Sequence, residues 1–237
     1  MNSTADTYSP RAIRPLTPLE GRVVGVLVEK QLTVPDTYPL SLNSLTSGCN
    51  QKTARSPVMN VTESDVVAAI DSLKRVSLVL EGSSSRVPRF EHNMGRVLGV
   101  PSQAVALLTA LLLRGPQTAA ELRTATTRLH GFADVSSVES FLDELAEREP
   151  PYVIKLPRVP GERESRWMHL LCGEVNIEEL RERAAASASS SSDDAAASFA
   201  EIDALRSEQK QLSAKMDRLQ AMVERMAKEL GIEPDAA

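Results

Sequence analysis

Residues 65–73 read DVVAAIDSL and residues 137–145 read SVESFLDEL, and these two stretches decide the fold. With a constant offset of 72 residues, apolar side chains coincide at Val66 and Val138, Ile70 and Leu142, and Leu73 and Leu145. Apolar positions that are three and four residues apart lie on one face of an amphipathic helix. The chain therefore contains two copies of one helix, each with a face to bury.

Each copy is followed by two short runs that are typical of β-strands. The runs are SLVLE at 77–81 and FEH at 90–92 in the first unit, and YVIKL at 152–156 and RWMHLL at 166–171 in the second. A polar turn with proline separates the two runs of each pair. This pattern predicts a β-hairpin after each copy of the helix, the first of them within residues 77–92.

Two further helices precede each copy. The periodic segments are 17–31 and 39–47 in the first unit, and 101–113 and 118–128 in the second. Three helices followed by a hairpin is the order of a winged helix-turn-helix domain. The sequence thus predicts a mainly α fold with small β-hairpins, of the α+β class, with tandem winged helix-turn-helix domains. Two unrelated small helical domains are the alternative.

Six parts are expected along the chain. They are a disordered N-terminus at 1–14, winged-helix domain 1 at 15–97, winged-helix domain 2 at 98–177, a flexible Ala/Ser linker at 178–198, a coiled-coil helix at 199–231 and a disordered end at 232–237. Aromatic residues make up only 3% of the chain. We therefore expect each winged-helix domain to close its own small aliphatic core.

The net charge of −5 is concentrated at the C-terminal end of the chain. Residues 175–237 carry −5, whereas residues 15–95 carry 0 and residues 96–174 carry −1. A nearly neutral body is not that of a strongly basic nucleic-acid binder, although it leaves room for a local positive stripe. Cys49 and Cys172 form no CxxC pattern, which favours a reducing compartment. With no signal peptide and no apolar run long enough to span a bilayer, we expect a cytoplasmic protein without a membrane partner.

Five stretches resemble the YceH-like family of uncharacterised bacterial proteins, over roughly residues 15–175. They are YPLSLNSLTSGCNQK, SPVMNVTE, SRVPRFEHN, LLLRGPQTAAELR and LPRVPGERESRWMHLL. The resemblance implies a tandem winged-helix fold in a bacterial cytosol and suspected nucleic-acid binding, with no established reaction. The chain departs from the family's pattern at Ala54, where asparagine is usual before Arg55, and at Ala125, where arginine is usual. Both departures would weaken a shared polar contact.

The third helix of a DNA-binding helix-turn-helix enters the major groove. In the first unit this helix, at 62–76, exposes Glu63, Asp65 and Asp71, so that its positive charge lies only at its C-terminal end. Further positive charge lies in the loop before the helix and in the wing after it. The candidate nucleic-acid-binding residues are Lys52, Arg55, Lys74, Arg75, Arg86 and Arg89. They are expected to contact phosphates of double-stranded DNA rather than to read bases.

Two competing interpretations remain open. The sequence of 47–64 favours a solvated connector that Pro57, Val58 and Met59 pin to the core over a phosphate-contacting loop. The third helix of the second unit, at 136–149, carries five carboxylates against Arg148 alone, so we expect no DNA contact there. A protein–protein adaptor, whose winged helices bind an unknown protein partner, is therefore the alternative to a DNA-binding transcriptional regulator or nucleoid-associated factor.

No catalytic, cofactor or metal site is expected. The histidines His92, His130 and His169 are scattered without the spacing of metal ligands, and the sequence has no glycine-rich nucleotide loop. Cys49 has no histidine near it in sequence, and a lone cysteine at the end of an apolar helix is usually a small buried residue. The sequence thus predicts a protein that is not an enzyme.

A heptad repeat follows the linker. Its a positions are Ile202, Gln209, Met216, Val223 and Leu230, and its d positions are Leu205, Leu212, Leu219 and Met226. A helix of this kind behind a linker has nothing of its own to bury against, so these residues predict a parallel homodimer in which Gln209 fixes the register. A helix that folds back onto the second unit is the alternative.

Overall fold

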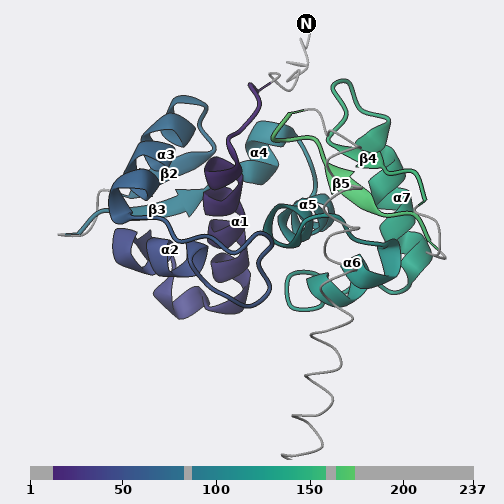
Figure 1. Ribbon diagram of the computed structural model, residues 1–237, viewed down its shortest axis with the longest axis horizontal. Coiled ribbons are helices and arrows are strands. Elements are labelled where there is room, and N and C mark those ends of the chain that lie inside the picture. The colour runs from purple at the N-terminus through teal and green to yellow at the C-terminus, as the bar shows by residue number, and fades with distance from the viewer. Residues whose placement is uncertain (1–12, 83–86, 159–163, 174–237) are drawn as a thin grey trace, which may run out of the picture. The chain divides into compact units, whose positions relative to one another are not determined.

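The computed structural model describes residues 13–82, 87–158 and 164–173, which belong to one compact unit (Figure 1). The elements of the first half are α1 (Pro18–Thr33), the 3-10 helix η1 (Pro35–Thr37), β1 (Leu40–Ser41), α2 (Leu42–Cys49), α3 (Glu63–Arg75), β2 (Val79–Gly82) and β3 (Arg89–His92). Those of the second half are α4 (Met94–Leu98), α5 (Ser102–Arg114), α6 (Ala119–Thr126), α7 (Val135–Ala146), β4 (Val153–Lys155) and β5 (Trp167–His169). Helices with small antiparallel sheets confirm the α+β class.

The second half repeats the element order of the first. Strands β1, β3 and β2 form an antiparallel sheet in the order β1-β3-β2, and β4 pairs with β5. In the second half a single bridge between Gln117 and Trp167 takes the place of β1, and it corresponds to the pairing of Leu40 with Phe90. The six predicted helices and both hairpins are confirmed, whereas η1, β1 and α4 were not expected.

One predicted helix begins later than expected. The helix expected at 39–47 begins at Leu42, because Leu40 and Ser41 pair with β3 instead. The hydroxyl of Ser41 then accepts a hydrogen bond from the main-chain N–H of Ser44 and caps α2. A two-residue strand gives no periodic signal, so the sequence pattern cannot separate it from the helix that follows.

The two matched helices bury the face that the repeat predicts. Helix α3 buries Val66, Ala69, Ile70 and Leu73, and α7 buries Val138, Leu142 and Leu145. Both begin at a polar cap, because Thr62 accepts a hydrogen bond from the N–H of Asp65, and Asp134 accepts one from the N–H of Ser137. Local capping and apolar spacing therefore agree at both sites, which is why the two helices are well placed from sequence alone.

The two halves share one hydrophobic core, which corrects the expectation of two separate cores. Val66 and Val138 belong to the same cluster of buried residues. The cluster is continuous because α1 packs extensively against α5, and Figure 1 shows these two helices side by side. Each half is small, so burying a second face of its first helix against the other half removes more apolar area from water than closing a separate core would.

Two glycines allow the close approach of α1 and α5. A Cβ atom on Gly25 would lie 2.9 Å from Cδ2 of Leu113, and one on Gly21 would lie 2.9 Å from Cδ2 of Leu112. Real Cβ atoms do not approach other heavy atoms so closely. The spacing of four residues places both glycines on the same face of α1. This face is therefore the contact surface between the two halves.

Main-chain hydrogen bonds also join the two halves. The N–H of Leu16 donates to the carbonyl of Leu171 at 2.8 Å, and the N–H of Ser56 donates to the carbonyl of Leu113 at 2.8 Å. These bonds lie at two different places along the chain, so the two halves are held in one orientation.

The ordered N-terminal part begins before residue 15. The guanidinium of Arg14 donates to both carboxylate oxygens of Glu20, at 2.6 and 2.9 Å, and to the hydroxyl of Ser72 at 2.6 Å. These bonds hold the pKa of Glu20 at about 2 although burial opposes the shift. The predicted disordered segment 1–14 is therefore too long by at least the last residue.

No helix among the described residues is long and apolar enough to cross a membrane.

The two hairpins each carry a histidine at the same register position. His92 pairs with Val79 and His169 pairs with Val153, and burial lowers the pKa of both histidines to about 4. Because the pKa in the unfolded chain is 6.5, the unfolded state binds more protons between pH 6.5 and pH 4. The stabilisation from keeping these rings neutral is complete above pH 6.5 and is lost as the pH falls through this window.

We expect His169→Gln to flatten the pH dependence of stability. A pKa lowered from 6.5 to about 4 corresponds to at most roughly 3 kcal/mol for one ring, most of which would disappear between pH 7 and pH 4.5. Urea unfolding at both pH values measures the difference for the wild type and for the variant. His130→Gln, outside the hairpins, is the control. Equal pH dependence in the wild type and His169→Gln would contradict the prediction.

Candidate nucleic-acid interface

The stretch between α2 and α3 is a closed surface loop, here called the 50–61 loop. The side-chain amide of Asn50 donates to the carbonyl of Val61 at 2.8 Å, and its oxygen accepts from the N–H of Val61 at 2.7 Å. The Asn50 side chain thus pairs with both the main-chain N–H and the carbonyl of Val61, at the other end of the loop. Compact loops with close ends of this kind are frequently functional.

Arg22 supports this loop from below. It lies on α1 and is only 1% exposed, and its guanidinium donates to the carbonyl of Cys49 at 3.1 Å and to that of Pro57 at 2.7 Å. Its Nε is buried without a hydrogen-bond partner among the described residues. Burial lowers the pKa of this guanidinium, and the nearby charge of Arg55 lowers it further.

Arg55 is also an internal residue. Its guanidinium forms a double hydrogen bond with Glu29 on α1, at 2.6 and 3.1 Å, and its Nε donates to the carbonyl of Gly48 at 3.3 Å. Burial alone would raise the pKa of Glu29, but the hydrogen bonds and charge of Arg55 outweigh it and the pKa is lowered. This placement does not fit the predicted phosphate contact, because every nitrogen of the guanidinium is already used inside the protein.

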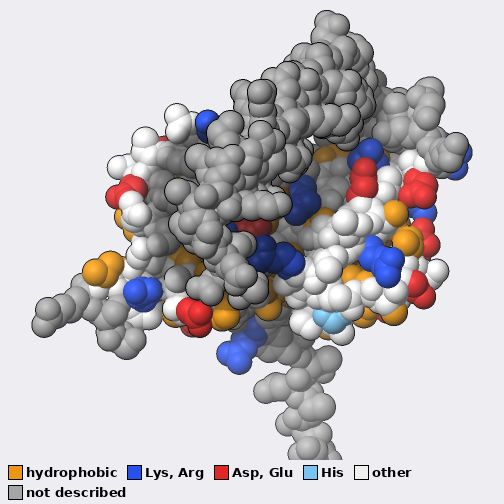
Figure 2. All heavy atoms as spheres, turned by 90° about the horizontal axis from the view of Figure 1, so that it is seen from below, with side chains coloured by type: hydrophobic (Ala, Val, Ile, Leu, Met, Phe, Trp, Pro, Cys, Tyr) orange, Lys and Arg blue, Asp and Glu red, His pale blue; other side chains and the backbone are white. Residues whose placement is uncertain are grey.

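Four cations nevertheless gather around the loop. Lys30 on α1 donates to the side-chain oxygen of Gln51 at 3.4 Å and lies 3.5 Å from Glu29, and Lys52 is exposed within the loop. Lys30, Arg22 and Arg55 lie near one carboxylate, that of Glu29, and with the exposed Lys52 these five residues have a formal net charge of +3. Figure 2 shows exposed Lys and Arg side chains, in blue, at several places on the face seen from below. We call these five residues and the 50–61 loop the cationic loop site.

The other predicted contact residues have different placements. Lys74 pairs with Glu81, and Arg89 donates to the carbonyl of Pro39 at 2.8 Å. Arg75 is exposed at the end of α3. Arg86 lies outside the described residues. Of the six predicted residues, the structure therefore leaves Lys52 and Arg75 as exposed cations, among those described, without a hydrogen bond or ion pair to the protein.

The predicted tail also lies outside the described residues. This applies to the linker at 178–198, the heptad helix at 199–231 and the end at 232–237, and hence to the proposed seam from Ile202 to Leu230.

Three residues of the cationic loop site were not predicted. Arg22, Glu29 and Lys30 stand on α1, which the sequence pattern assigns to the core, and they come near the loop only in the folded chain. One signal was available. Arg22 precedes the run VVGVLV, and a charged residue beside an apolar stretch of a buried helix needs buried acceptors, which a polar loop supplies.

The exposed charges of the third helices lie where the sequence predicts them. Helix α3 exposes Glu63, Asp65 and Asp71, with Lys74 and Arg75 at its C-terminal end, whereas α7 exposes Glu139, Asp143 and Glu144. A phosphate backbone would be repelled by the face of α7. The chemistry of the site therefore favours contact through the cationic loop site rather than insertion of a helix into a groove.

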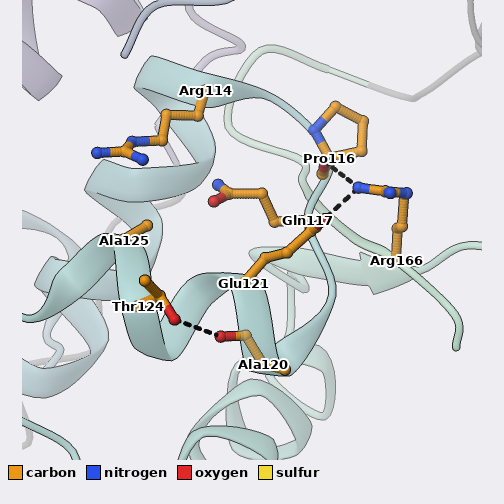
Figure 3. Close-up of a pocket in the computed structure, with 8 residues that line it drawn as sticks. All are labelled: Arg114, Pro116, Gln117, Ala120, Glu121, Thr124, Ala125 and Arg166. Carbon is orange, nitrogen blue, oxygen red and sulfur yellow. Dashed lines mark hydrogen bonds and ion pairs between the residues drawn. The ribbon is translucent and has the colours of Figure 1, made fainter. Parts of the chain in front are cut away.

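A second positive feature lies in the other half, in an open pocket of about 640 Å³ along α6. Figure 3 shows Arg114 and Arg166 on opposite sides of it. Arg166 donates to Glu121 at 2.8 Å and to the carbonyl of Pro116 at 3.3 Å, whereas Arg114 is exposed at the end of α5. Ala125 lines the pocket, so the arginine usual at this position would add charge here.

Cys49 is buried, as its sequence context indicates, and Cys172 is partly buried. Burial raises the pKa of Cys49 to about 12 and that of Cys172 to about 11. Both thiols are therefore protonated at neutral pH, and a protonated thiol is a poor nucleophile and metal ligand. Among the described residues no three His, Cys, Asp or Glu side chains are placed to hold a metal ion.

Ala54 adopts a left-handed conformation, with φ of 56°. Asparagine tolerates this region better than alanine, which loses energy through its Cβ. We expect Ala54→Asn to raise the free energy of unfolding by about 0.5–1 kcal/mol. Urea denaturation measures the change. Ala133→Asn, at an exposed loop position without positive φ, is the control and should have no such effect.

The described residues form an α+β protein of two similar halves, each with three helices and a hairpin. The halves share one core, and the first carries a cationic surface loop. Residues 16–162 match the family model described as "Protein of unknown function, DUF480", and the chain belongs to this family. This agrees with the resemblance to the YceH-like family.

Relatives match over the whole chain. A UPF0502 protein of Burkholderia multivorans is 67% identical over 236 residues, which cover 100% of this chain and 98% of the relative. A UPF0502 protein of Cupriavidus pinatubonensis is 69% identical over 236 residues, which cover 100% of this chain and 99% of the relative. The similarity therefore extends past the family model into the C-terminal segment.

Proposed function

We propose that this protein is a tandem winged-helix protein that binds double-stranded DNA through the cationic loop site of its first half. The fold part rests on the order helix, strand, helix, helix, hairpin and on the sheet order β1-β3-β2. The single observation that carries the DNA part is the local net charge of +3 beside the third helix. Binding of this kind positions the duplex and reads no bases.

The exposed cations Lys52 and Arg75 flank α3 at its two ends, one in the loop before it and one in its last turn. They can reach phosphates without placing the acidic face of α3 in a groove. We therefore expect weak affinity that depends on salt and little on sequence.

Salt-dependent binding of full-length protein to duplex DNA tests the proposal. Replacing Lys52 and Arg75 together by alanine should weaken binding and reduce the slope of log K against log salt by about 2. The matched control replaces Arg128 and Arg158, two exposed arginines of the second half, by alanine and makes the same change in net charge. Equal slopes in all three proteins, or no salt-dependent binding by the wild type, would reject the function.

We further propose that the protein acts as a homodimer paired through the heptad residues Ile202 to Leu230. A dimer would place two cationic loop sites on one duplex and raise the effective affinity of each. Sedimentation of full-length protein and of a variant ending at Arg183 tests this. If the shortened chain self-associates as strongly as the full chain, the tail is not the dimerisation element.

A protein–protein adaptor is the second candidate, and two observations favour it. The face of α7 carries three exposed carboxylates and no exposed cation. Large exposed apolar side chains among the described residues all lie in the first half, and they are Leu32, Val34, Val58, Val67, Leu80 and Val87. If the adaptor function holds, Glu139→Lys with Asp143→Lys should abolish co-purification of a partner from cells.

A further inference from the structure

The 50–61 loop leaves main-chain donors free at the surface. The carbonyls of Ala54 and Pro57 accept hydrogen bonds from Arg55 and Arg22. In contrast, the N–H groups of Lys52, Thr53 and Ala54, all described residues, donate to no protein acceptor. Two main-chain carbonyls of the loop thus accept hydrogen bonds from buried guanidiniums, whereas three successive main-chain N–H groups are available to a ligand.

One residue of this run has a backbone conformation that occurs in anion-binding turns. Ala54 is left-handed, with φ of 56°. A turn with such a residue can point successive N–H groups at one anion. The side chain of Lys52 lies at the same place in the loop and is exposed. Main-chain amides and an ammonium group together match the oxygens and the charge of a phosphate.

The charged side chains beneath the loop are mainly positive, like the ammonium group of Lys52. Arg22 and Arg55 lie beneath it and Lys30 beside it, and Glu29 alone opposes them. The surplus charge of the buried guanidiniums cannot reach a ligand by direct contact, because their donors bind carbonyls and Glu29. It raises the potential at the amides and keeps the loop in its shape. Both effects favour an anion over the neutral or cationic ligands.

We propose that the 50–61 loop binds a phosphate group through the N–H groups of Lys52, Thr53 and Ala54 and the ammonium of Lys52, with Arg22 and Arg55 as positioning residues. This inference rests on the proposed function, in which the phosphate belongs to duplex DNA. It gives Arg55 an indirect part in binding. It also explains why a protein with an acidic third helix can contact a phosphate backbone, since no helix has to enter a groove.

Substitution of Glu29 by glutamine distinguishes a positioning role of Arg55 from simple electrostatic attraction between the site and DNA. Glu29→Gln makes the surface more positive, so a purely electrostatic site would bind duplex DNA more tightly. If Arg55 positions the loop, the same variant should bind about three- to tenfold more weakly, because the charged partner of Arg55 is lost. Glu63→Gln, at the exposed start of α3, is the matched control and should bind as tightly as the wild type or more tightly.

The second measurement follows the amides directly. The ¹⁵N-labelled full chain is titrated with a 20-base-pair duplex of random sequence and, separately, with pyrophosphate. Amide signals of Lys52, Thr53 and Ala54 should shift with the duplex in the wild type, and less in Glu29→Gln. Arg55→Lys, which keeps the charge and loses the double hydrogen bond, should behave like Glu29→Gln. Thermal melting of each variant shows whether it is folded.

The outcomes distinguish the inference from the function it rests on. Duplex binding without shifts at these three amides, or with tighter binding by folded Glu29→Gln, overturns the inference and leaves DNA binding in place. Shifts with pyrophosphate but no binding of duplex overturn the DNA function and support the loop as a site for a free phosphate compound. No response to either probe overturns both.

Discussion

Truncation of Arg55 to alanine is expected to lower the free energy of unfolding by about 3 kcal/mol. The side chain of Arg55 is fully buried, and that of its partner Glu29 is 18% exposed. Removal of the guanidinium leaves a largely buried carboxylate with only Lys30 near it, at 3.5 Å, and leaves the carbonyls of Gly48 and Ala54 without this donor. The loss of one member of a buried ion pair typically costs about 3–5 kcal/mol. Partial exposure of Glu29 places the expected cost at the lower end of that range.

The matched control is Lys74→Ala, which breaks the exposed ion pair between Lys74 and Glu81. Exposed pairs contribute about 0–1 kcal/mol, so this variant should melt close to the wild type. Chemical denaturation followed by circular dichroism measures both changes. If Arg55→Ala were as stable as Lys74→Ala, Arg55 would not support the fold, and the assignment of the 50–61 loop as a structure held from beneath would be wrong.

Replacement of Gly25 by leucine is expected to cost about 3 kcal/mol or more. Its Cβ would meet Cδ2 and Cγ of Leu113 at 2.9 and 3.0 Å and Cβ of Leu112 at 3.5 Å, so the whole added side chain has no space between α1 and α5. Overpacking of a core typically costs about 1–3 kcal/mol, and a leucine adds more volume than most such changes. Leucine also favours helix over glycine by somewhat less than 1 kcal/mol, which offsets a little of this cost.

Gly131→Leu is the control for this substitution, because a Cβ at Gly131 would meet no atom within 4 Å. The variants are compared by thermal unfolding with probes in both halves, for example the fluorescence of Trp167 and the ellipticity of the helices. A shared core implies that Gly25→Leu destabilises both halves in one transition. Separate transitions for the two halves would contradict the shared core.

Much of the fold follows from the sequence because local signals agree there. The capped, periodic helices α3 and α7 and the two hairpins lie close to where their patterns place them. The shared core does not follow from the sequence. Gly21 and Gly25 read as ordinary glycines of a helix, and only the packing of α1 against α5 shows that they serve close approach.

The candidate site was less predictable than the fold. Lys52 is exposed as predicted, but Arg55 looks the same in sequence and is buried. The difference depends on Glu29 and Arg22, which are separated from Arg55 by 26 and 33 residues and approach it only in the folded chain. A charged side chain in a polar loop is a surface residue unless a distant partner is present, and spacing within the loop contains no information about that partner.

The packing of α1 against α5 has a consequence for how this molecule can be divided. A polypeptide cut between residues 92 and 93 would leave Gly21 and Gly25 facing water on one fragment and Leu112 and Leu113 on the other. Each fragment should aggregate or remain partly unfolded when it is expressed alone. When the two are mixed, they should associate and regain the native fold. Swapping one half for that of a relative would work only if the matching glycines and leucines were transplanted together.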